Sequence, residues 1–151
     1  MSQPAEATTE GLKAISQWVN IYLENNGNKD MKLQSIELSY GHLYSVQGRR
    51  QDRRGRSVRV QEPPQLVLKA CGKWGSNTGT TGEFSLVDPA KDDKRIRHFY
   101  FDSPYNESMN TWTISGTNDE WMIQDKGVNL GPGGTLGTIF VEIMNKPAGD
   151  D

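Results

Sequence analysis

Short runs in which apolar and polar residues alternate dominate this chain, and turn-forming residues separate the runs. In residues 17–24, the side chains of Val19, Ile21 and Leu23 share one face. This two-residue period is typical of a half-buried strand, so we expect these three side chains to point into a core. Asn and Gly in residues 25–30 tolerate the positive φ angles of a turn, which predicts the end of the strand there.

Residues 31–40 contain a break in the alternation, because the apolar side chains move from odd to even positions between Leu33 and Ile36. A shift of one residue would turn every following side chain to the other face of the sheet. A β-bulge, which inserts one extra residue into a strand, restores the inward direction. The pattern therefore predicts a strand with a bulge near Ser35.

Six further strands are expected where apolar and aromatic residues cluster between segments rich in Gly, Pro, Asn and Asp. They are residues 66–71, 82–87, 95–101, 111–116, 120–124 and 135–143. Many short strands at even spacing favour an all-β fold, and we expect an antiparallel β-sandwich. A chain of 151 residues is the usual size of a single domain with one core.

We expect this single domain to be flanked by two short segments. Residues 1–16 lack a strand pattern and are predicted to be an N-terminal extension, either loose or a short helix. Residues 17–146 are expected to form the sandwich and residues 147–151 a C-terminal tail. The first residues lack the basic and apolar segments of a secretory signal, so we expect synthesis in the cytoplasm, with release by another route left open.

The aromatic residues divide into two groups by their positions in the expected elements. Those expected in the core lie within strands: Phe84, Phe99, Phe101 and Phe140. Tyr100 lies between two of these phenylalanines, so it is expected to face outward. Four others lie near strand ends or in loops, where a ring is more often available for a ligand or a membrane interface: Trp18, Tyr40, Trp74 and Tyr105.

The charge of the chain is unevenly distributed. Residues 49–59 hold six arginines and one aspartate, a net charge of +5, and the whole chain has a net charge of −2, which leaves −7 for the remainder. Such a run is either a solvated loop or a patch for an anion or a partner. The patch would consist of Arg49, Arg50, Arg53, Arg54, Arg56 and Arg59. No nucleic-acid-binding module accompanies it, so we expect no nucleic acid as a partner.

The sequence contains few groups that could carry out catalysis or bind a metal. The two histidines, His42 and His98, are far apart, and the HExxH, CxxC and GxSxG motifs are absent. Asp102 lies four residues after His98, a spacing at which two residues of a strand need not meet. The single Cys71 excludes a disulfide within the chain and is expected to be a small apolar strand residue. We therefore expect no enzyme activity, no cofactor and no metal site.

Eight short motifs occur in an order that resembles the aegerolysin family. They are A-C-G (70–72), G-T-T-G (79–82), F-x-L-V-D-P (84–89), R-H-F-Y (97–100), N-T-W-T (110–113), S-G-T-N (115–118), W-M-I (121–123) and L-G-T-I (136–139). Q-W-V (17–19) and S-Y-G-x-L (39–43) extend the resemblance to about residues 17–146, with a gap at 46–64. The resemblance implies a small β-sandwich that binds membrane lipids without spanning the bilayer.

The resemblance also implies a function. Members of the family bind sphingolipid-rich membranes, some of them together with a sterol, and several are the targeting component of a two-component pore-forming, cytolytic toxin. A larger partner with a membrane-attack-complex/perforin (MACPF) domain inserts the pore, and some bacterial pairs are insecticidal. The expected partners are therefore membrane lipids and a larger MACPF-type protein, and the expected place of action is the surface of a target-cell membrane after release.

The lipid-facing residues of the family can be carried over by position. Trp18 matches the tryptophan of Q-W-V, Tyr40 stands where the family has a tryptophan before G-x-L, and Tyr105 stands in place of a loop tryptophan. Tyr100 matches the tyrosine of R-H-F-Y, which lies near the lipid headgroup in the family. We expect these four rings, together with Trp74, to face the membrane.

Two polar positions depart from the family pattern. Thr78 replaces a glutamate before G-T-T-G, and Ser108 stands in place of a lysine before N-T-W-T. Either Arg97 or the arginine run at 49–59 could supply the missing positive charge for a headgroup phosphate. The resemblance therefore leaves the headgroup preference open.

Two other interpretations of the function are also compatible with the sequence. A glycan-binding or protein-surface-binding β-sandwich, without pore formation, would use the same rings to stack on sugars or on a partner. A homo-oligomer would form through exposed sheet edges or through an intermolecular disulfide of Cys71.

Overall fold

The computed structural model describes residues 17–45, 56–60, 64–72, 79–105, 108–131 and 134–147. Within these ranges the chain forms ten strands and one short 3₁₀ helix, η1 (Pro89–Lys91). The predicted N-terminal extension and nearly all of the predicted C-terminal tail lie outside them. In the part of the chain that is described, no helix has the length and apolar character needed to cross a membrane.

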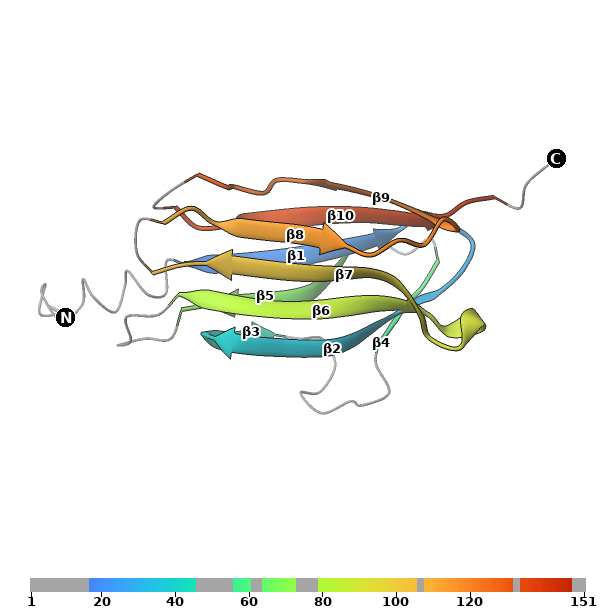
Figure 1. Ribbon diagram of the computed structural model, residues 1–151, viewed down its shortest axis with the longest axis horizontal. Coiled ribbons are helices and arrows are strands. Elements are labelled where there is room, and N and C mark those ends of the chain that lie inside the picture. Colours follow the sequence, from blue (N-terminus) through green and yellow to red (C-terminus); the bar gives the residue numbers. More distant parts are fainter. Residues whose placement is uncertain are drawn as a thin grey trace, which may run out of the picture.

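The strands form two five-stranded sheets that lie one behind the other (Figure 1). Sheet A has the order β3 (His42–Ser45), β5 (Gln65–Cys71), β1 (Trp18–Asn25), β10 (Gly137–Asn145) and β9 (Trp121–Lys126). Sheet B has the order β4 (Arg56–Val58), β2 (Met31–Tyr40), β6 (Thr80–Asp88), β7 (Lys94–Ser103) and β8 (Thr111–Ser115). The predicted all-β sandwich is confirmed.

One strand pair differs from the expected antiparallel arrangement. β1 and β10 run parallel, with Val19 beside Gly137 and Asn25 beside Ile143, while the other described pairs are antiparallel. Both strands begin at the same end of the sandwich, since the Thr135 hydroxyl, just before β10, donates to the carbonyl of Trp18. This contact between the first and last strands could not be read from local alternation.

The core lies between the sheets and is built from the alternating side chains that the sequence pattern predicts. Val19, Ile21 and Leu23 are fully buried on β1, as expected. On sheet B, Phe84 and Phe99 are fully buried, and their stacked rings have centroids 4.6 Å apart. Truncating a buried phenylalanine of this kind to alanine costs about 3–5 kcal/mol, so this inner face supplies much of the stability.

Phe140 contradicts the expectation that it is a core residue. Phe101 is buried as predicted, but Phe140 lies on the outer face of sheet A with 39% of its surface exposed. Ile139 and Val141 take the inward positions of β10 on either side of it. The run around Phe140 is almost continuously apolar, so the sequence could not show which of its residues would face the core.

The bulge predicted in β2 is confirmed. Ser35 has a φ of 57°, and the register between β2 and β6 shifts between Gln34 and Glu37. The short strand β4 was not predicted, because the arginine-rich stretch has a single apolar residue there, Val58, which is 1% exposed. Strand β3 was not predicted either, since its four residues follow Gly41 without a turn signal of their own.

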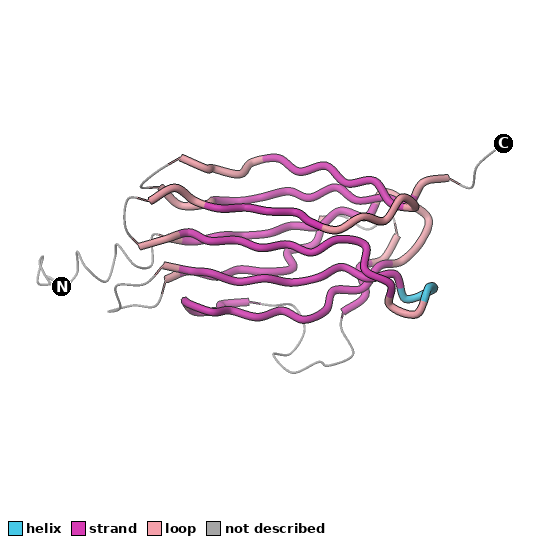
Figure 2. The backbone as a smooth tube through the Cα atoms, in the orientation of Figure 1, coloured by secondary structure: helices cyan, strands magenta, loops and turns pink. Residues whose placement is uncertain are grey.

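The two ends of the sandwich differ in the side chains they present. At one end β1 begins and β2 and β7 finish, and we call this the aromatic end because it carries Trp18, Tyr40 and Tyr105. It lies on the left in Figure 1, where the arrows of β2 and β7 point, and on the left in Figure 2, which has the same orientation. At the opposite end, here called the far end, β1 finishes and β2 and β7 begin. Figure 2 shows loops connecting the strands at both ends.

Candidate functional site

Three of the predicted membrane-facing rings lie at the aromatic end, on three separate segments. Trp18 is the first residue of β1 and half-buried, and Tyr40 is the last residue of β2 with 57% of its surface exposed. Tyr105 follows β7 and is half-buried. Because the three segments belong to both sheets, the three residues are distributed over both layers of this end of the sandwich.

A close approach of two backbones places Tyr105 at this end. A Cβ atom on Gly79 would overlap the carbonyl oxygen of Ser103 and lie 2.8 Å from the backbone nitrogen of Tyr105. Glycine is therefore required at the start of the G-T-T-G motif, because any side chain would push the segment that carries Tyr105 away. Gly41, with a φ of 102°, permits a similar close approach next to Tyr40.

Buried amides hold the loops of the aromatic end together. The side chain of Gln17, with its nitrogen directed toward the carbonyl groups, donates to the carbonyls of Pro104 at 3.2 Å and Gly134 at 3.1 Å. The backbone nitrogen of Trp18 donates to Thr135 Oγ1 at 2.7 Å. The backbone next to Trp18 is thereby linked to the segment that carries Tyr105 and to the loop before β10.

Asn110 makes a second link between the same loops. Its side chain is 5% exposed, and its Nδ2 atom donates to the carbonyls of Asn129 at 2.8 Å and Gly134 at 2.9 Å. The β7–β8 connection is therefore joined to the β9–β10 connection through a single amide. Gln17 and Asn110 are the first residues of the Q-W-V and N-T-W-T motifs, but neither was predicted as a site residue from the sequence.

Tyr100 lies beside this end on the outer face of sheet B, as predicted. It pairs in register with Glu83 and Thr113. Burial, and then the negative charges of Asp102 and Glu83, raise the pKa of the Tyr100 phenol above its usual value. The phenol therefore stays protonated at physiological pH and can donate a hydrogen bond.

Carboxylates surround Tyr100 on this face. Glu37 pairs in register with Glu83, and Asp102 accepts a hydrogen bond from the Thr81 hydroxyl at 2.8 Å. A group of negative charges disfavours an anionic ligand beside Tyr100 and favours one that ends in an ammonium group.

His98 is hydrogen-bonded within the same face, but not to Asp102. Its Nδ1 atom lies 2.9 Å from Ser85 Oγ and its Nε2 atom lies 3.3 Å from Glu83 Oε2. A Ser–His–carboxylate chain can activate a serine nucleophile, yet Ser85 is only 5% exposed within the sheet. His98 is therefore a hydrogen-bonded strand histidine whose partners are Ser85 and Glu83.

Arg97 is not brought to the aromatic end. Its guanidinium donates to the carbonyls of Ile96 at 2.7 Å, Asn118 at 3.3 Å and Trp121 at 3.4 Å. Trp121 begins β9 of sheet A at the far end, so Arg97 joins the two sheets there. It therefore does not occupy the place of the family lysine that Ser108 replaces.

Replacing Arg97 with methionine should lower stability without affecting the aromatic end. Methionine retains much of the apolar stem but removes the guanidinium hydrogen bonds to the carbonyls of Asn118 and Trp121, which should cost about 1–3 kcal/mol. Chemical denaturation should show the lower free energy of unfolding. Vesicle binding measured below the melting temperature should match the wild type, and a selective loss of binding would contradict this placement of Arg97.

The remaining predicted site residues fall into two groups. Ser108 is exposed in the β7–β8 connection, and Arg59 is exposed just after β4, at the far end. Arg56 lies in β4, and its backbone pairs with that of Leu33 in β2. Those outside the described residues are Trp74, Thr78, Arg49, Arg50, Arg53 and Arg54.

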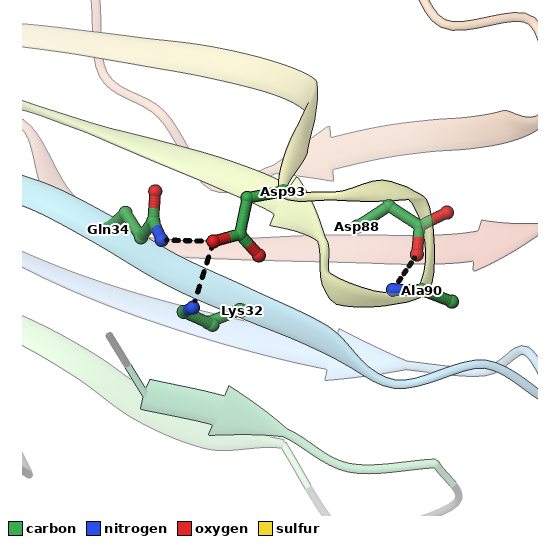
Figure 3. A network of polar contacts seen from close by, with 5 residues as sticks. All are labelled: Lys32, Gln34, Asp88, Ala90 and Asp93. Carbon is green, nitrogen blue, oxygen red and sulfur yellow. Dashed lines mark hydrogen bonds and ion pairs between the residues drawn. The ribbon is translucent and has the colours of Figure 1, made fainter. Parts of the chain in front are cut away.

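Polar contacts at the far end connect β2 with the turn before β7 (Figure 3). Asp93 accepts hydrogen bonds from Lys32 Nζ and Gln34 Nε2, each at 3.1 Å, and Asp88 accepts one from the backbone nitrogen of Ala90 at 3.0 Å. The carboxylates of this turn therefore stabilise its conformation. Across the described ranges, no three His, Cys, Asp or Glu side chains are grouped so as to hold a metal ion.

A family model and two known proteins match most of this chain. The family model described as Aegerolysin matches residues 16–146. Ostreolysin A6 from Pleurotus ostreatus is 41% identical over 138 residues, which cover 88% of this chain and 98% of that protein. Aegerolysin Aa-Pri1 from Cyclocybe aegerita is 39% identical over 139 residues, which cover 89% and 94%.

The fold also matches a solved structure. The crystal structure of IP-1A from Alcaligenes faecalis superposes with a TM-score of 0.74 at 24% sequence identity and covers 91% of this chain and 97% of that one. At this identity the likeness supports the fold alone.

Proposed function

This chain belongs to the aegerolysin family, and from that premise we propose that it binds membrane lipids through the aromatic end of the sandwich. The observation that carries the proposal is the presence of Trp18, Tyr40 and Tyr105 on three separate segments at one end. Tryptophan and tyrosine combine an apolar ring with a polar tip, and they prefer the boundary between lipid and water. The aromatic end would therefore enter the headgroup region without crossing the bilayer.

The proposed ligand is a sphingolipid, alone or with a sterol, as the family suggests. Its headgroup would lie beside Tyr100, whose protonated phenol can donate to a phosphate oxygen. Glu37, Glu83 and Asp102 favour a zwitterionic headgroup with a terminal ammonium over a purely anionic one. Ser108 lacks the charge of the family lysine, so phosphate recognition would rely on neutral donors.

The proposed biological role is the targeting component of a two-component pore-forming toxin. The chain would be made in the cytoplasm and released, and would then bind a target-cell membrane and recruit a larger MACPF-type protein that inserts the pore. An insecticidal target is consistent with the family. We propose a binding protein rather than an enzyme, since His98 and Ser85 form a closed hydrogen-bonded cluster within the sheet.

A vesicle panel tests this proposal. Co-sedimentation should detect binding to vesicles that contain a zwitterionic sphingolipid with or without cholesterol, weaker binding to phosphatidylcholine alone, and the weakest binding to phosphatidylglycerol. Leakage of an entrapped dye should stay at background in the same vesicles, because the proposed role leaves the pore to the partner. Equal binding to all compositions would contradict the headgroup assignment, and strong leakage by this chain alone would contradict the two-component role.

A glycan-binding function is the second candidate, and one observation favours it. Tyr100 is surrounded by Glu83, Asp102 and Thr113, groups that suit the hydroxyls of a sugar stacked on an aromatic ring. Competition by free sugars, together with no sedimentation with protein-free lipid vesicles, would support this function over lipid binding.

A further inference from the structure

The outer face of sheet A carries an apolar row that does not belong to the aromatic end. Leu66, Tyr22 and Phe140 lie side by side on β5, β1 and β10 in register. The rings of Tyr22 and Phe140 are stacked with centroids 5.1 Å apart, and Lys126 Nζ lies 5.9 Å from the centroid of Phe140. Phe140 is 39% exposed, so the row presents apolar surface to its surroundings.

The outer face of sheet B has no comparable row among its described residues. Its central positions are occupied by polar side chains in register: Gln34, Glu37, Thr81, Glu83, Ser85, His98, Asp102 and Thr113, with Tyr100 among them. Among the residues that the structure describes, an exposed phenylalanine with a stacked aromatic neighbour therefore occurs on the outer face of sheet A and not on that of sheet B.

Charges of opposite sign lie on the two sides of the apolar row. Toward the far end, Glu24 and Glu142 pair directly in register on β1 and β10. Toward the aromatic end, Lys69 pairs with Asn20, two positions before Tyr22. The described residues contain no ion pair for Glu24, Glu142 or Lys69, although Glu142 accepts a hydrogen bond from an asparagine.

Two carboxylates placed directly opposite each other repel, so this pair would gain from a positive charge supplied by another molecule. A second copy of the chain carries such a charge at a matching position. The two copies face each other through the outer faces of sheet A, and a half turn about an axis that runs between them along the apolar row relates one to the other. Leu66, Tyr22 and Phe140 then meet their equivalents in the second copy. The same rotation places Lys69 of each copy beside Glu24 of the other.

The alternative symmetric arrangement is unfavourable. A half turn about an axis along the strands would bring Glu24 and Glu142 of both copies together in one group of four carboxylates. In the first arrangement, the facing sheets would pack about 10 Å apart, and a lysine side chain from one copy together with a glutamate side chain from the other can bridge that distance. The charges therefore select the arrangement in which the strands of the two copies run in opposite directions.

We propose that two copies of this chain pair through the outer face of sheet A in this antiparallel arrangement. Their aromatic ends then point away from each other. In combination with the proposed lipid binding, on which this second step rests, one dimer binds two bilayers and tethers them. Membrane tethering is a different activity from recruiting a pore-forming partner to one bilayer.

Self-association can be tested without lipid by sedimentation velocity over a range of protein concentrations. The wild type should form a dimer in the micromolar range that weakens at high salt. Lys69→Glu and Glu24→Lys should each raise the dissociation constant at least about tenfold, because each places like charges in contact twice per dimer. The double variant Lys69→Glu/Glu24→Lys should restore the wild-type constant, which serves as the matched control for charge and folding.

The tethering step is tested with vesicles that the wild type binds. Dynamic light scattering should show aggregation of vesicles by the wild type and by the double charge-swap variant, and little aggregation by either single variant. All four proteins should bind a single supported bilayer to within about twofold at saturating protein.

Each contrary outcome identifies the step that is wrong. A wild type that stays monomeric, or a dimer that is insensitive to Lys69 and Glu24, would overturn the assignment of this face. A charge-sensitive dimer that binds the supported bilayer without aggregating vesicles would overturn the antiparallel arrangement. Failure to bind the supported bilayer would instead contradict the proposed function, and sedimentation would still decide the pairing.

Discussion

A variant that carries both Trp18→Ala and Tyr105→Ala should lose nearly all binding to target vesicles. Full burial of a large apolar side chain contributes about 1.5–3 kcal/mol, so each ring corresponds to roughly a tenfold to hundredfold change in partition coefficient. The rings lie on different segments, which favours additive effects. The double variant should therefore bind at least about a hundredfold more weakly than the wild type in a vesicle sedimentation titration.

Tyr22→Ala is the matched control for this experiment. Tyr22 is a half-buried aromatic residue four positions after Trp18 on β1, but it lies on the outer face of sheet A instead of at the aromatic end. Removal of the Tyr22 ring should leave the partition coefficient on a supported bilayer unchanged. Circular dichroism should show that all variants are folded. Equal binding by the double variant and the wild type would show that the aromatic end is not the membrane-binding surface.

Replacing Asn110 with alanine should weaken both the fold and membrane binding. The change removes two hydrogen bonds and leaves the carbonyls of Asn129 and Gly134 without this donor, which should cost about 2–4 kcal/mol. The loop beside Tyr105 would then lose one of its links to the loop that holds Trp18 through Thr135, while the link through Gln17 remains. We expect the partition coefficient to fall at least about tenfold at temperatures where the variant remains folded, with stability measured by denaturant titration.

Asn145→Ala is the control that separates positioning from stability. Asn145 is 6% exposed at the far end, and its Oδ1 accepts hydrogen bonds from the backbone nitrogens of Asn28 at 2.8 Å and Lys29 at 3.1 Å. The Asn145→Ala variant should lose about as much free energy of unfolding as the Asn110→Ala variant, while its vesicle binding stays at the wild-type level. If the two variants lose binding in equal measure, Asn110 contributes only to the fold and does not position the aromatic rings.

The strands of the core were predictable because the pattern that indicates them is local. Val19, Ile21 and Leu23 alternate with polar neighbours, and their burial follows from the pleat of a strand alone. The bulge at Ser35 was predictable for the same reason, since one extra residue between Leu33 and Ile36 lets the apolar side chains on both sides of it face the core.

The aromatic residues of the candidate site were predictable from the sequence, but the side chains that hold its loops together were not. The family motifs pointed to Trp18, Tyr40 and Tyr105, and the structure places all three at one end. Gln17 and Asn110 each begin a family motif, but no local pattern indicates that their amides connect the loops, because Gln and Asn are common beside turns. Arg97 was a reasonable candidate for a headgroup contact, yet its guanidinium donates to the carbonyl of Trp121 in the opposite sheet and to that of Asn118 in the β8–β9 connection.

The sequence by itself determined the all-β class, the inward face of most strands and the identity of the aromatic residues at strand ends. These properties depend on neighbours within a few positions, so alternation and turn residues are sufficient to predict them. Only the tertiary structure decided that β1 and β10 run parallel, that Phe140 faces outward beside Tyr22, and which charges flank it. Those properties depend on the pairing of β1 with β10 and with β5, strands that are far apart in the sequence, so no local pattern encodes them.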